Sequence, residues 1–470
     1  MMREDLIEIE IGAFSKIQNG YAFKSKEYVD KGLRIIRIAN VQSGEIIDRD
    51  PKFYPGSRLS EFKDYVIEED DFLISLTGNV GRVGRIGKSL LPALLNQRVG
   101  KLNLQTNSIE KSYLYYFLNS RAFVHQVIKS SKGVGQLNTS SKKIEAIKIP
   151  IAPLSVQRAI VAKIEELFSD LDKGIADLKK AQDQLKVYRQ AVLKKAFEGE
   201  LTKEWREQQT DLPTADEFLE QIKEERQKHY EQQIENWKEA LKVWEENGKE
   251  GKKPGKPKKL KYFDISEDVY DKLPESYKQF TWFSLGNLFT ESPQNGLYEP
   301  ASKYGSGTSI IRIDSFYDGQ ILNIEEFKRV ELSKSDIKRY SLNENEILVN
   351  RVNSIEYLGK CGLVKQLNET TVFESNIMRL KILNSCINSQ YITLFLSSVL
   401  GEREIRRFAK HAVNQASINQ TDVSLTPIPI CTLEEQEQVV KEVSTCLSVC
   451  EKLEESITVS LVKAKALNVA

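Results

Sequence analysis

The chain has 470 residues, of which 40% are apolar and 29% are charged, and its formal net charge is +1. This length predicts roughly two to four globular domains, and this composition excludes a wholly disordered protein. The N-terminus lacks an apolar signal segment and no run approaches the roughly 18 apolar residues of a membrane span, so we expect a cytoplasmic protein. All five cysteines lie in the second half and do not predict a disulfide framework.

Five segments are predicted in chain order, of which the first and fourth are globular and the second and fifth are long helices. The third segment combines a charged helix with a linker rich in Lys, Pro and Gly. Their bounds are 1–153, 154–200, 201–279, 280–432 and 433–470.

The first globular segment separates its charges along the chain. Residues 1–71 carry 11 Lys/Arg and 15 Asp/Glu, whereas residues 72–150 carry 12 Lys/Arg and only Glu110 and Glu145 as acids. Such a basic stretch is typical of a phosphate-binding face. A basic surface that pairs with the acidic first part, or with a protein partner, is the alternative interpretation.

The two globular segments repeat one another, with an offset of 275 residues at Ile35 and Ile310 and of 279 residues at Leu154 and Leu433. Five motifs recur in order, which chance does not explain. In each repeat, short β-branched runs alternate with one helical stretch, over 112–130 and 389–410, so we expect two α+β domains related by an internal pseudo-two-fold repeat. The matching motifs are Ile35–Ile38 with Ile310–Ile313, Asp71–Ile74 with Glu346–Val349, Gly133–Gln136 with Ala412–Gln415, Ile149–Ile151 with Ile428–Ile430, and Leu154–Gln157 with Leu433–Gln436.

Each repeat runs into a long helix, expected over 157–197 and 434–466. Both helices carry apolar residues three and four positions apart, which is typical of a coiled coil. Because neither stripe can stay exposed, we expect the two helices to pack antiparallel in one coiled coil. The stripes are Ile160, Ile164, Leu167, Leu171, Ile175, Leu178, Leu185, Tyr188 and Val192 in the first helix and Val439, Val443, Leu447, Cys450, Leu453, Ile457, Leu461 and Ala464 in the second.

The segment between the repeats has two parts. Residues 213–246 are strongly charged and place Trp237 and Trp244 at helical spacing, which predicts a surface helix. Residues 247–261 contain seven Lys, two Pro and three Gly, the composition of a flexible linker. Contact of these lysines with DNA phosphates is the alternative interpretation.

The chain shows no convincing catalytic, cofactor or metal site. Gly87-Lys88-Ser89 ends like a phosphate-binding loop, but Arg82 stands where that loop requires a glycine. The three histidines are widely separated, and Cys446 and Cys450 have helical rather than metal-ligand spacing. Methyltransferase and nuclease signatures are absent or no more frequent than chance in so charged a chain.

Polar and basic residues in the Gly-rich turns are the candidates for DNA contact, because short rigid loops can enter a groove. The alternative is that the asparagines only shape turns. The candidates are Thr77, Asn79, Arg82, Arg85, Asn96, Gln97, Arg98, Gln136 and Asn138 in the first repeat, and Asn350, Arg351, Asn353, Asn376, Asn414, Gln415, Ser417 and Asn419 in the second.

Several of these stretches resemble the specificity (S) subunit of type I restriction-modification systems. Gly20–Ser25 is similar to the entry motif of that family, and Ile149–Val161 followed by Leu193–Thr202 is similar to its central helical region. Leu273–Glu275, Trp282 and Leu285-Gly286 resemble the entry to its second target-recognition domain. One departure is that the second repeat has Ser292–Tyr298 in place of Gly-Tyr-Ala-Phe.

The resemblance implies a non-catalytic DNA-recognition subunit with two target-recognition domains and two helical spacers. Its expected partners are double-stranded DNA, two methyltransferase (modification) subunits and motor-nuclease (restriction) subunits. No cofactor is expected in this chain, whereas S-adenosylmethionine, ATP and Mg are expected in the partner subunits. Divergence of the loops Thr77–Val80 and Val352–Ile355 predicts a bipartite target with two unlike half-sites.

Two other functions compete with this one. The first is a self-contained DNA methyltransferase or nuclease whose motifs have diverged, which methylation assays on the isolated chain would detect. The second is a coiled-coil scaffold for proteins only. The basic stretch 72–150 and the duplicated domain argue against a scaffold.

Overall fold

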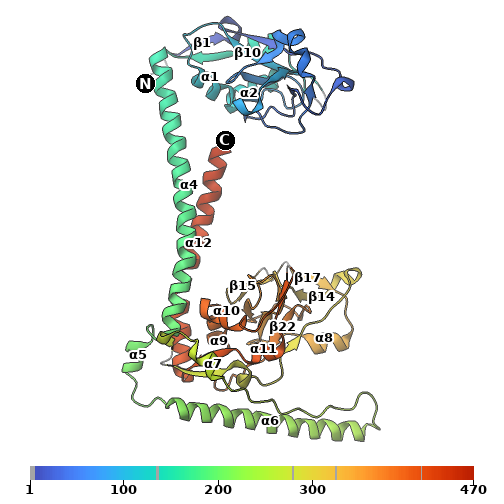
Figure 1. Cartoon of the computed structure of the whole chain (residues 1–470), viewed down its shortest axis with the longest axis vertical. Helices are drawn as coiled ribbons and strands as arrows, with labels where there is room; N and C mark the ends of the chain where they lie inside the picture. The colour runs from blue at the N-terminus through green and yellow to red at the C-terminus, as the bar shows by residue number, and fades with distance from the viewer. Residues whose placement is uncertain are drawn as a thin grey trace. The chain divides into compact units, whose positions relative to one another are not determined.

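The computed structural model describes residues 6–133, 137–277, 280–322, 325, 327–413 and 415–469. The chain forms two compact units (Figure 1), the first made of Met1–Leu178 with Ser460–Ala470 and the second of Lys179–Val459. The boundary between the units falls inside a long helix. Each unit contains one of the predicted repeats.

The first repeat is built on two sheets, with strand orders β2-β10-β7-β8-β4 and β5-β3-β9-β6. Its central strands are short and apolar on both faces, because each sheet face is covered. Neighbouring strands are antiparallel except for β3 with β9 and β4 with β8. The strands are β2 (Ser15–Asn19), β3 (Leu33–Ile36), β4 (Gly44–Glu45), β5 (Phe53–Tyr54), β6 (Val66–Ile67), β7 (Phe72–Ser75), β8 (Val83–Arg85), β9 (Ala93–Leu95) and β10 (Val99–Leu104).

The second repeat has the same plan, with sheets ordered β13-β22-β18-β20 and β17-β14-β21. The parallel pair of β14 with β21 corresponds to that of β3 with β9. Two smaller sheets, β15-β16 and β19-β24-β23, are added. The strands are β13 (Gln294–Asn295), β14 (Tyr304–Ile311), β15 (Phe316–Tyr317), β16 (Gln320–Ile321), β17 (Lys328–Val330), β18 (Ile347–Asn350), β19 (Val352–Asn353), β20 (Cys361–Leu363), β21 (Thr371–Phe373), β22 (Ile377–Leu380), β23 (Lys410–Ala412) and β24 (Gln415–Ser417).

The helical stretch predicted in each repeat is two helices rather than one. Ser120 and Ser398 interrupt it, because each side chain caps a second helix by accepting a hydrogen bond from the backbone N–H of Phe123 (3.3 Å) or Gly401 (3.0 Å). The helices of the two repeats are α1 (Lys111–Leu118), α2 (Arg121–Ser130), α3 (Ser141–Glu145), α8 (Lys334–Tyr340), α9 (Ser389–Leu396), α10 (Val399–Ile405) and α11 (Gln420–Ser424).

Each repeat closes on itself just before its long helix. In the first, β1 (Ile7–Glu10) pairs antiparallel with β11 (Lys148–Ile151), and in the second, β12 (Thr281–Ser284) pairs antiparallel with β25 (Pro427–Ile430). The first and last strands of each domain therefore lie side by side. The expected α+β fold with an internal repeat is confirmed.

A buried glutamine at the start of each long helix joins the helix to its domain. Gln157 accepts a hydrogen bond from the N–H of Glu110 (2.8 Å) and donates to the carbonyl oxygen of Ala152 (2.7 Å). Gln436 accepts from the N–H of Asn388 (2.9 Å) and donates to the carbonyl oxygen of Cys431 (2.8 Å). These are the glutamines that the sequence repeat places 279 residues apart.

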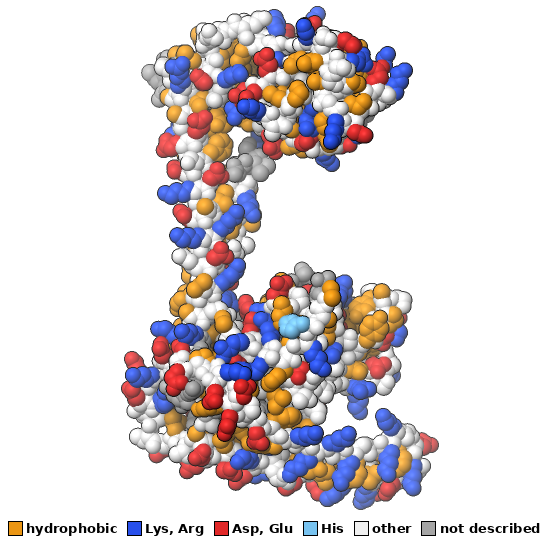
Figure 2. All heavy atoms as spheres, in the orientation of Figure 1, with side chains coloured by type: hydrophobic (Ala, Val, Ile, Leu, Met, Phe, Trp, Pro, Cys, Tyr) orange, Lys and Arg blue, Asp and Glu red, His pale blue; other side chains and the backbone are white. Residues whose placement is uncertain are grey.

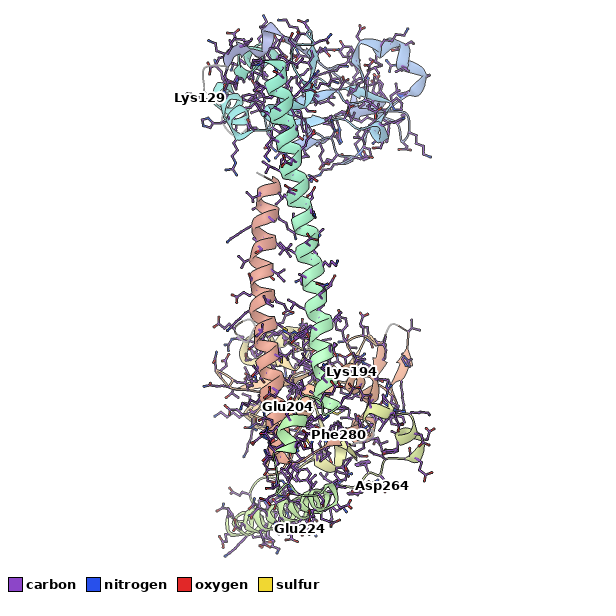
Figure 3. The ribbon with its side chains drawn as sticks, turned by 90° about the vertical axis from the view of Figure 1, so that its left-hand side faces the viewer. Lys129, Lys194, Glu204, Glu224, Asp264 and Phe280 are labelled. Carbon is purple, nitrogen blue, oxygen red and sulfur yellow. The ribbon has the colours of Figure 1, made fainter. Side chains whose placement is uncertain are left out.

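The two long helices are α4 (Leu154–Phe197) and α12 (Leu433–Val469). Within the second unit they run antiparallel, because Arg189 pairs with Glu454 (3.4 Å) whereas Arg206, beyond the end of α4, binds Glu435 (2.9 Å) near the start of α12. Their shared core with the second domain includes Phe197, whose ring lies 5.3 Å from that of Tyr391. Figure 3 labels Lys194, where α4 reaches this domain, and Glu204 on α5 (Lys203–Glu207). The stripes are not buried throughout: Leu167 is 55% exposed and Leu453 48%.

The third segment contains the predicted surface helix, α6 (Ala215–Glu246). Residues 249–261, here called the lysine strand although they form no β-strand, contact this helix. Their backbone returns along α6, accepting hydrogen bonds from the indole N–H of Trp237 (to Pro254, 3.1 Å) and Trp244 (to Gly251, 3.4 Å). The segment expected to be a linker therefore contacts α6, and its flexibility stays a prediction. A short helix, α7 (Glu267–Asp271), follows it.

Among the described helices, none combines the length and apolar character that crossing a membrane requires.

Candidate nucleic-acid interface

Three segments that are distant in sequence meet at one edge of the first domain, and we call the described residues 76–85, 96–98, 132–133 and 137–138 the first rim. The N–H of Leu76 donates to the carbonyl oxygen of Arg98 (3.1 Å) and the N–H of Gly78 to that of Leu137 (2.8 Å). Thr77 and Asn138 form a β-bridge. The structure thus brings together the candidates chosen from three separate turns of the first repeat.

The second rim consists of the described residues 350–355, 374–376, 410–413 and 415–419. The N–H of Arg351 donates to the carbonyl oxygen of Asn376, and the N–H of Ile418 to that of Arg351, both at 2.9 Å. Val352 pairs with Ser417 in the contact between β19 and β24. The candidates of the second repeat also converge.

The two rims use equivalent main-chain contacts. The bond from Leu76 to Arg98 corresponds to that from Arg351 to Asn376, and the bridge of Thr77 with Asn138 corresponds to the pairing of Val352 with Ser417. The same backbone scaffold therefore carries different side chains in the two repeats.

A glycine in each repeat allows two backbone segments beside the rim to approach closely. A Cβ on Gly20 would collide with the carbonyl oxygens of Leu95 and Asn96, and a Cβ on Gly296 would collide with those of Phe373 and Glu374. Gly296 is therefore the structural counterpart of Gly20. The second repeat lacks the rest of the Gly-Tyr-Ala-Phe entry motif but keeps this glycine. A side chain at that position would collide with the backbone.

Arginine side chains of the first rim keep groups available for a ligand. Arg82 donates to the side-chain oxygen of Gln42 (2.7 Å), and Arg85 lies 3.5 Å from Asp70 and over the ring of Tyr115. Arg98 is exposed, and within the described residues no ion pair or hydrogen bond engages its guanidinium group. Hydrogen-bonding capacity therefore remains on all three guanidinium groups.

The other first-rim candidates differ in exposure. Asn79, Gln97 and Asn138 are exposed and Thr77 is half-buried, whereas Asn96 is only 9% exposed and accepts a hydrogen bond from the N–H of Arg98 (3.4 Å). Asn96 thus shapes its own turn. Gln136 lies outside the described residues.

The second rim separates supporting residues from exposed ones. Asn350 is fully buried and donates to the carbonyl oxygen of Ile313 (3.2 Å), so it cannot reach DNA in this conformation. Asn419 caps α11 by accepting from the N–H groups of Thr421 (2.8 Å) and Asp422 (3.1 Å), and Asn353 accepts from the N–H of Ser354 (2.8 Å). For these residues the turn-forming interpretation fits the structure better.

The remaining second-rim candidates lie at the surface or close to it. Gln415 is exposed, Asn376 and Ser417 are half-buried, and Arg351 donates to the carbonyl oxygen of Ser375 (3.2 Å). Asn414 lies outside the described residues.

Lys410, His411 and Val413 are functional candidates that the sequence reasoning missed. Lys410 and His411 are exposed on β23, and Val413 is 91% exposed just after this strand. Lys132 bridges with Asn138 as Lys410 pairs with Ser417, and it is also exposed. The 279-residue offset was the available signal, because it aligns these positions with the matching turns.

The two acids of the basic stretch 72–150 are both engaged within the first unit. Glu145 accepts a hydrogen bond from the N–H of Ile17 (2.9 Å), and Glu110 lies 3.6 Å from Arg158. The basic side chains of the first rim are therefore not neutralised by them, which suits a phosphate-binding face.

The cysteines are free thiols, and two of them lie deep in the second domain. Desolvation by burial raises the pKa of Cys361 to about 12 and that of Cys386 to about 11. A raised pKa keeps a thiol neutral and poorly nucleophilic, so these residues fill the core.

Comparison with known proteins agrees with this geometry. The family model described as type I restriction modification DNA specificity domain matches residues 4–180 and 278–461, which is one match for each repeat and more than half of the chain. The EcoKI specificity subunit of Escherichia coli is 22% identical over 97% of this chain and 85% of its own length, and the EcoAI specificity subunit, also from Escherichia coli, is 34% identical over 35% of this chain and 28% of its own length.

Solved structures share the fold. A chain from a structural study of complex assembly and conformational transition in a type I R-M system aligns with a TM-score of 0.54 at 15% identity, over 100% of this chain and 97% of its own. The HsdS subunit from Thermoanaerobacter tengcongensis aligns with a TM-score of 0.50 at 14% identity, over 99% and 95%. The chain therefore belongs to the family of type I restriction-modification DNA specificity subunits, the non-catalytic DNA-recognition components of those systems.

Proposed function

We propose that each rim reads one half of a bipartite, asymmetric site in double-stranded DNA. The observation that carries this proposal is the pair of equivalent backbone scaffolds with unlike side chains. Equivalent scaffolds present side chains to DNA in the same way, and unlike side chains select different base edges. The two half-sites should therefore differ in sequence.

The exposed and half-buried rim residues are the proposed contacts. Arginine and lysine suit phosphates or guanine edges, and Asn and Gln suit adenine. These residues are Thr77, Asn79, Arg82, Arg85, Gln97, Arg98 and Asn138 in the first rim and Arg351, Asn376, Lys410, His411, Gln415 and Ser417 in the second.

The long helices are the proposed spacers between the half-sites. Helix α4 has 44 residues, which corresponds to about 66 Å at 1.5 Å per residue. Paired half-sites one turn of DNA apart are about 34–36 Å from centre to centre. The helix is long enough to set such a spacing.

Catalysis belongs to the partners in this proposal. Two modification subunits would methylate DNA with S-adenosylmethionine, and motor-nuclease subunits would need ATP and Mg. The similarity to a chain from a study of complex assembly in a type I R-M system supports this view. Methylome sequencing of cells that express the whole system would identify the target.

Exchange of one domain tests the two-rim proposal. Replacing residues 1–150 by the same segment of a relative should change one half-site and leave the other unchanged, as read from the methylated sequence. A change in both half-sites would contradict independent reading.

Insertion of four residues near Asp177 tests the spacer. The insertion adds about 6 Å of helix and should lengthen the unread gap without changing either half-site, because neither rim is altered. Altered half-site bases would rule out the spacer role.

A further inference from the structure

The lysine strand and α6 form a hairpin in the second unit that lies between the two stretches matched to the family. Beyond the two tryptophan hydrogen bonds, Arg226 donates to the carbonyl oxygen of Lys261 (2.6 Å), and Lys259 donates to the side-chain oxygen of Gln227 (2.9 Å). These contacts hold the strand along the helix from end to end. Figure 3 labels Glu224 on α6 and Asp264 just beyond the strand.

The charges of the hairpin are unevenly matched. All four lysines of α6 pair with glutamates of the same helix: Lys223 with Glu220 (2.6 Å), Lys228 with Glu225 (2.8 Å), Lys238 with Glu235 (2.6 Å) and Lys242 with Glu246 (3.9 Å). The seven lysines of the strand are all exposed, and over the described part of the chain none forms an ion pair. Each lysine of α6, a helix with ten acidic and five basic residues, is thus paired, whereas the ammonium groups of the strand have no ion-pair partner among the described residues.

Both tryptophan rings of α6 contact lysines of the strand. Lys256 lies 5.8 Å from the centre of the Trp237 ring, and Lys253 lies 5.9 Å from that of Trp244. Together with Lys259, these two lysines help to hold the strand, and the other four extend from a fixed backbone. Figure 2 shows Lys and Arg side chains gathered along α6 and the segment beside it.

The length of this basic row matches a repeating polyanion. Residues 249–252 include a turn and a bend, and the extended remainder, 253–261, spans about 28 Å at about 3.1 Å per residue, while phosphates recur about every 3.4 Å along each DNA strand. Lysine binds phosphate as a point charge without demanding a fixed geometry. Apart from Glu250, no acidic or exposed aromatic residue lies between these lysines. A row of positive charges of this kind is suited to a ligand of uniform negative charge.

We propose that the lysine strand binds the phosphate backbone of duplex DNA that flanks the recognised site, independently of base sequence. This inference rests on the proposed DNA-reading function, because it concerns additional contacts to the same duplex. An acidic protein surface is the other class of partner, and it becomes an outcome of the test.

The test compares two variants with the same change in charge. One replaces Lys249, Lys252, Lys258 and Lys261 by Gln, and the control replaces Lys223, Lys228, Lys238 and Lys242 of α6 by Gln. Each full-length chain is assembled with its modification subunits, and its affinity is measured over a salt series. Two duplexes are used: one trimmed to the recognised site and one with long flanks.

On the flanked duplex, the strand variant should lose affinity by about tenfold at low salt. Its slope of log affinity against log salt should become shallower by about 0.9 for each phosphate that the variant no longer neutralises. On the trimmed duplex it should bind like the unmodified complex, and its methylated sequence should be unchanged. The α6 control should match the unmodified complex on both duplexes.

Equal salt slopes for the strand variant and the unmodified complex on the flanked duplex would overturn the inference, as would loss of subunit assembly, which would indicate an acidic protein partner. An equal loss in the α6 control would also overturn it, because the effect would then follow net charge alone. Failure of the unmodified complex to select any duplex sequence would instead refute the proposed function.

Discussion

The first and second rims have equivalent main-chain hydrogen bonds, but the chain that follows these bonds folds differently in each. After Leu76 the first rim turns through Gly78 and Gly81, whose φ angles of 76° and 82° favour glycine. After Arg351 the second rim continues as β19 in the sheet β19-β24-β23. The same support thus carries a glycine loop in one repeat and a small sheet in the other.

Both rims have a buried polar residue at the end of the strand that leads into them. Ser75 and Asn350 occupy equivalent positions at the ends of β7 and β18, and they are only 2% and 0% exposed. Each donates to a nearby carbonyl oxygen, that of Asn79 or of Ile313. Buried polar residues hold each rim in place, and the proposed contacts with DNA lie among the exposed residues beyond them.

The largest expected effect is a loss of DNA binding by both rims, caused by disrupting the long helix α4. Replacing Leu171 and Leu178 of α4, which are half-buried, by Asp should unfold the helix or abolish assembly, because desolvating each carboxylate costs several kcal/mol. Size-exclusion chromatography with the partner subunits and circular dichroism would measure this. Leu167→Asp, at a position that is 55% exposed, is the matched control and should be tolerated. Normal assembly and DNA binding by the double variant would show that this stripe is not a helix interface.

A smaller effect should separate the rims. Gly20→Ala and Gly296→Ala each force a Cβ against carbonyl oxygens of the same domain and should cost about 1–3 kcal/mol of local stability. Hydrogen exchange of peptides from each repeat would localise the loss. Each variant should weaken reading of its own half-site only. If either substitution disturbs both repeats equally, the domains are not independent.

A single rim residue should affect binding alone. Arg98→Ala should cost about 1–3 kcal/mol and relax one base position if Arg98 reads a base, or weaken all sequences alike if it binds a phosphate. Asn419→Ala, in contrast, should lower the stability of α11 by about 1 kcal/mol without relaxing specificity. Affinity for a set of single-base variants of the target distinguishes these outcomes. No effect of Arg98→Ala on any duplex would remove it from the proposed contacts.

The smallest effect at neutral pH concerns the cysteines, all of which lie in the second half of the chain. Burial raises the pKa of Cys361 from 9.0 to about 12, so the folded state disfavours the thiolate. The stabilisation is present below pH 9 and is lost as pH rises toward 12, by up to about 1.4 kcal/mol for each pH unit. Urea unfolding at pH 7 and pH 10.5 should show a smaller alkaline loss for Cys361→Ala than for the natural chain. Equal losses would show that this thiol does not titrate with unfolding.

Much of the fold could be predicted because the two repeats of the chain can be aligned with one another. The offset between Ile35 and Ile310 marked equivalent strands, and that between Leu154 and Leu433 marked the two helix starts. The same offsets predicted that Thr77 and Asn138 belong to turns matching Val352 and Ser417. The repeat thus indicated which loops of the two domains are equivalent, but the convergence of these loops within each domain appears only in the structure.

Burial of single polar residues and the path of the lysine strand could not be predicted in the same way. Asn350 has the composition of a turn residue, and only the fold shows that its amide points to Ile313. The contacts of the strand with α6 were not predicted because Lys, Pro and Gly are also the residues of free linkers. The seven-residue spacing of Trp237 and Trp244 was the overlooked signal, since two indoles on one face of a charged helix need a covering segment.

The glutamine joints have a consequence for inheritance. Gln157 and Gln436 bind their domains through peptide N–H and carbonyl groups alone, and every amino acid except proline supplies both. The joint is therefore indifferent to which side chains the attached domain carries, provided that its chain follows the same path. A genetic crossover near either glutamine could deliver a complete foreign domain as a cassette that seats on the resident helix without compensating mutations.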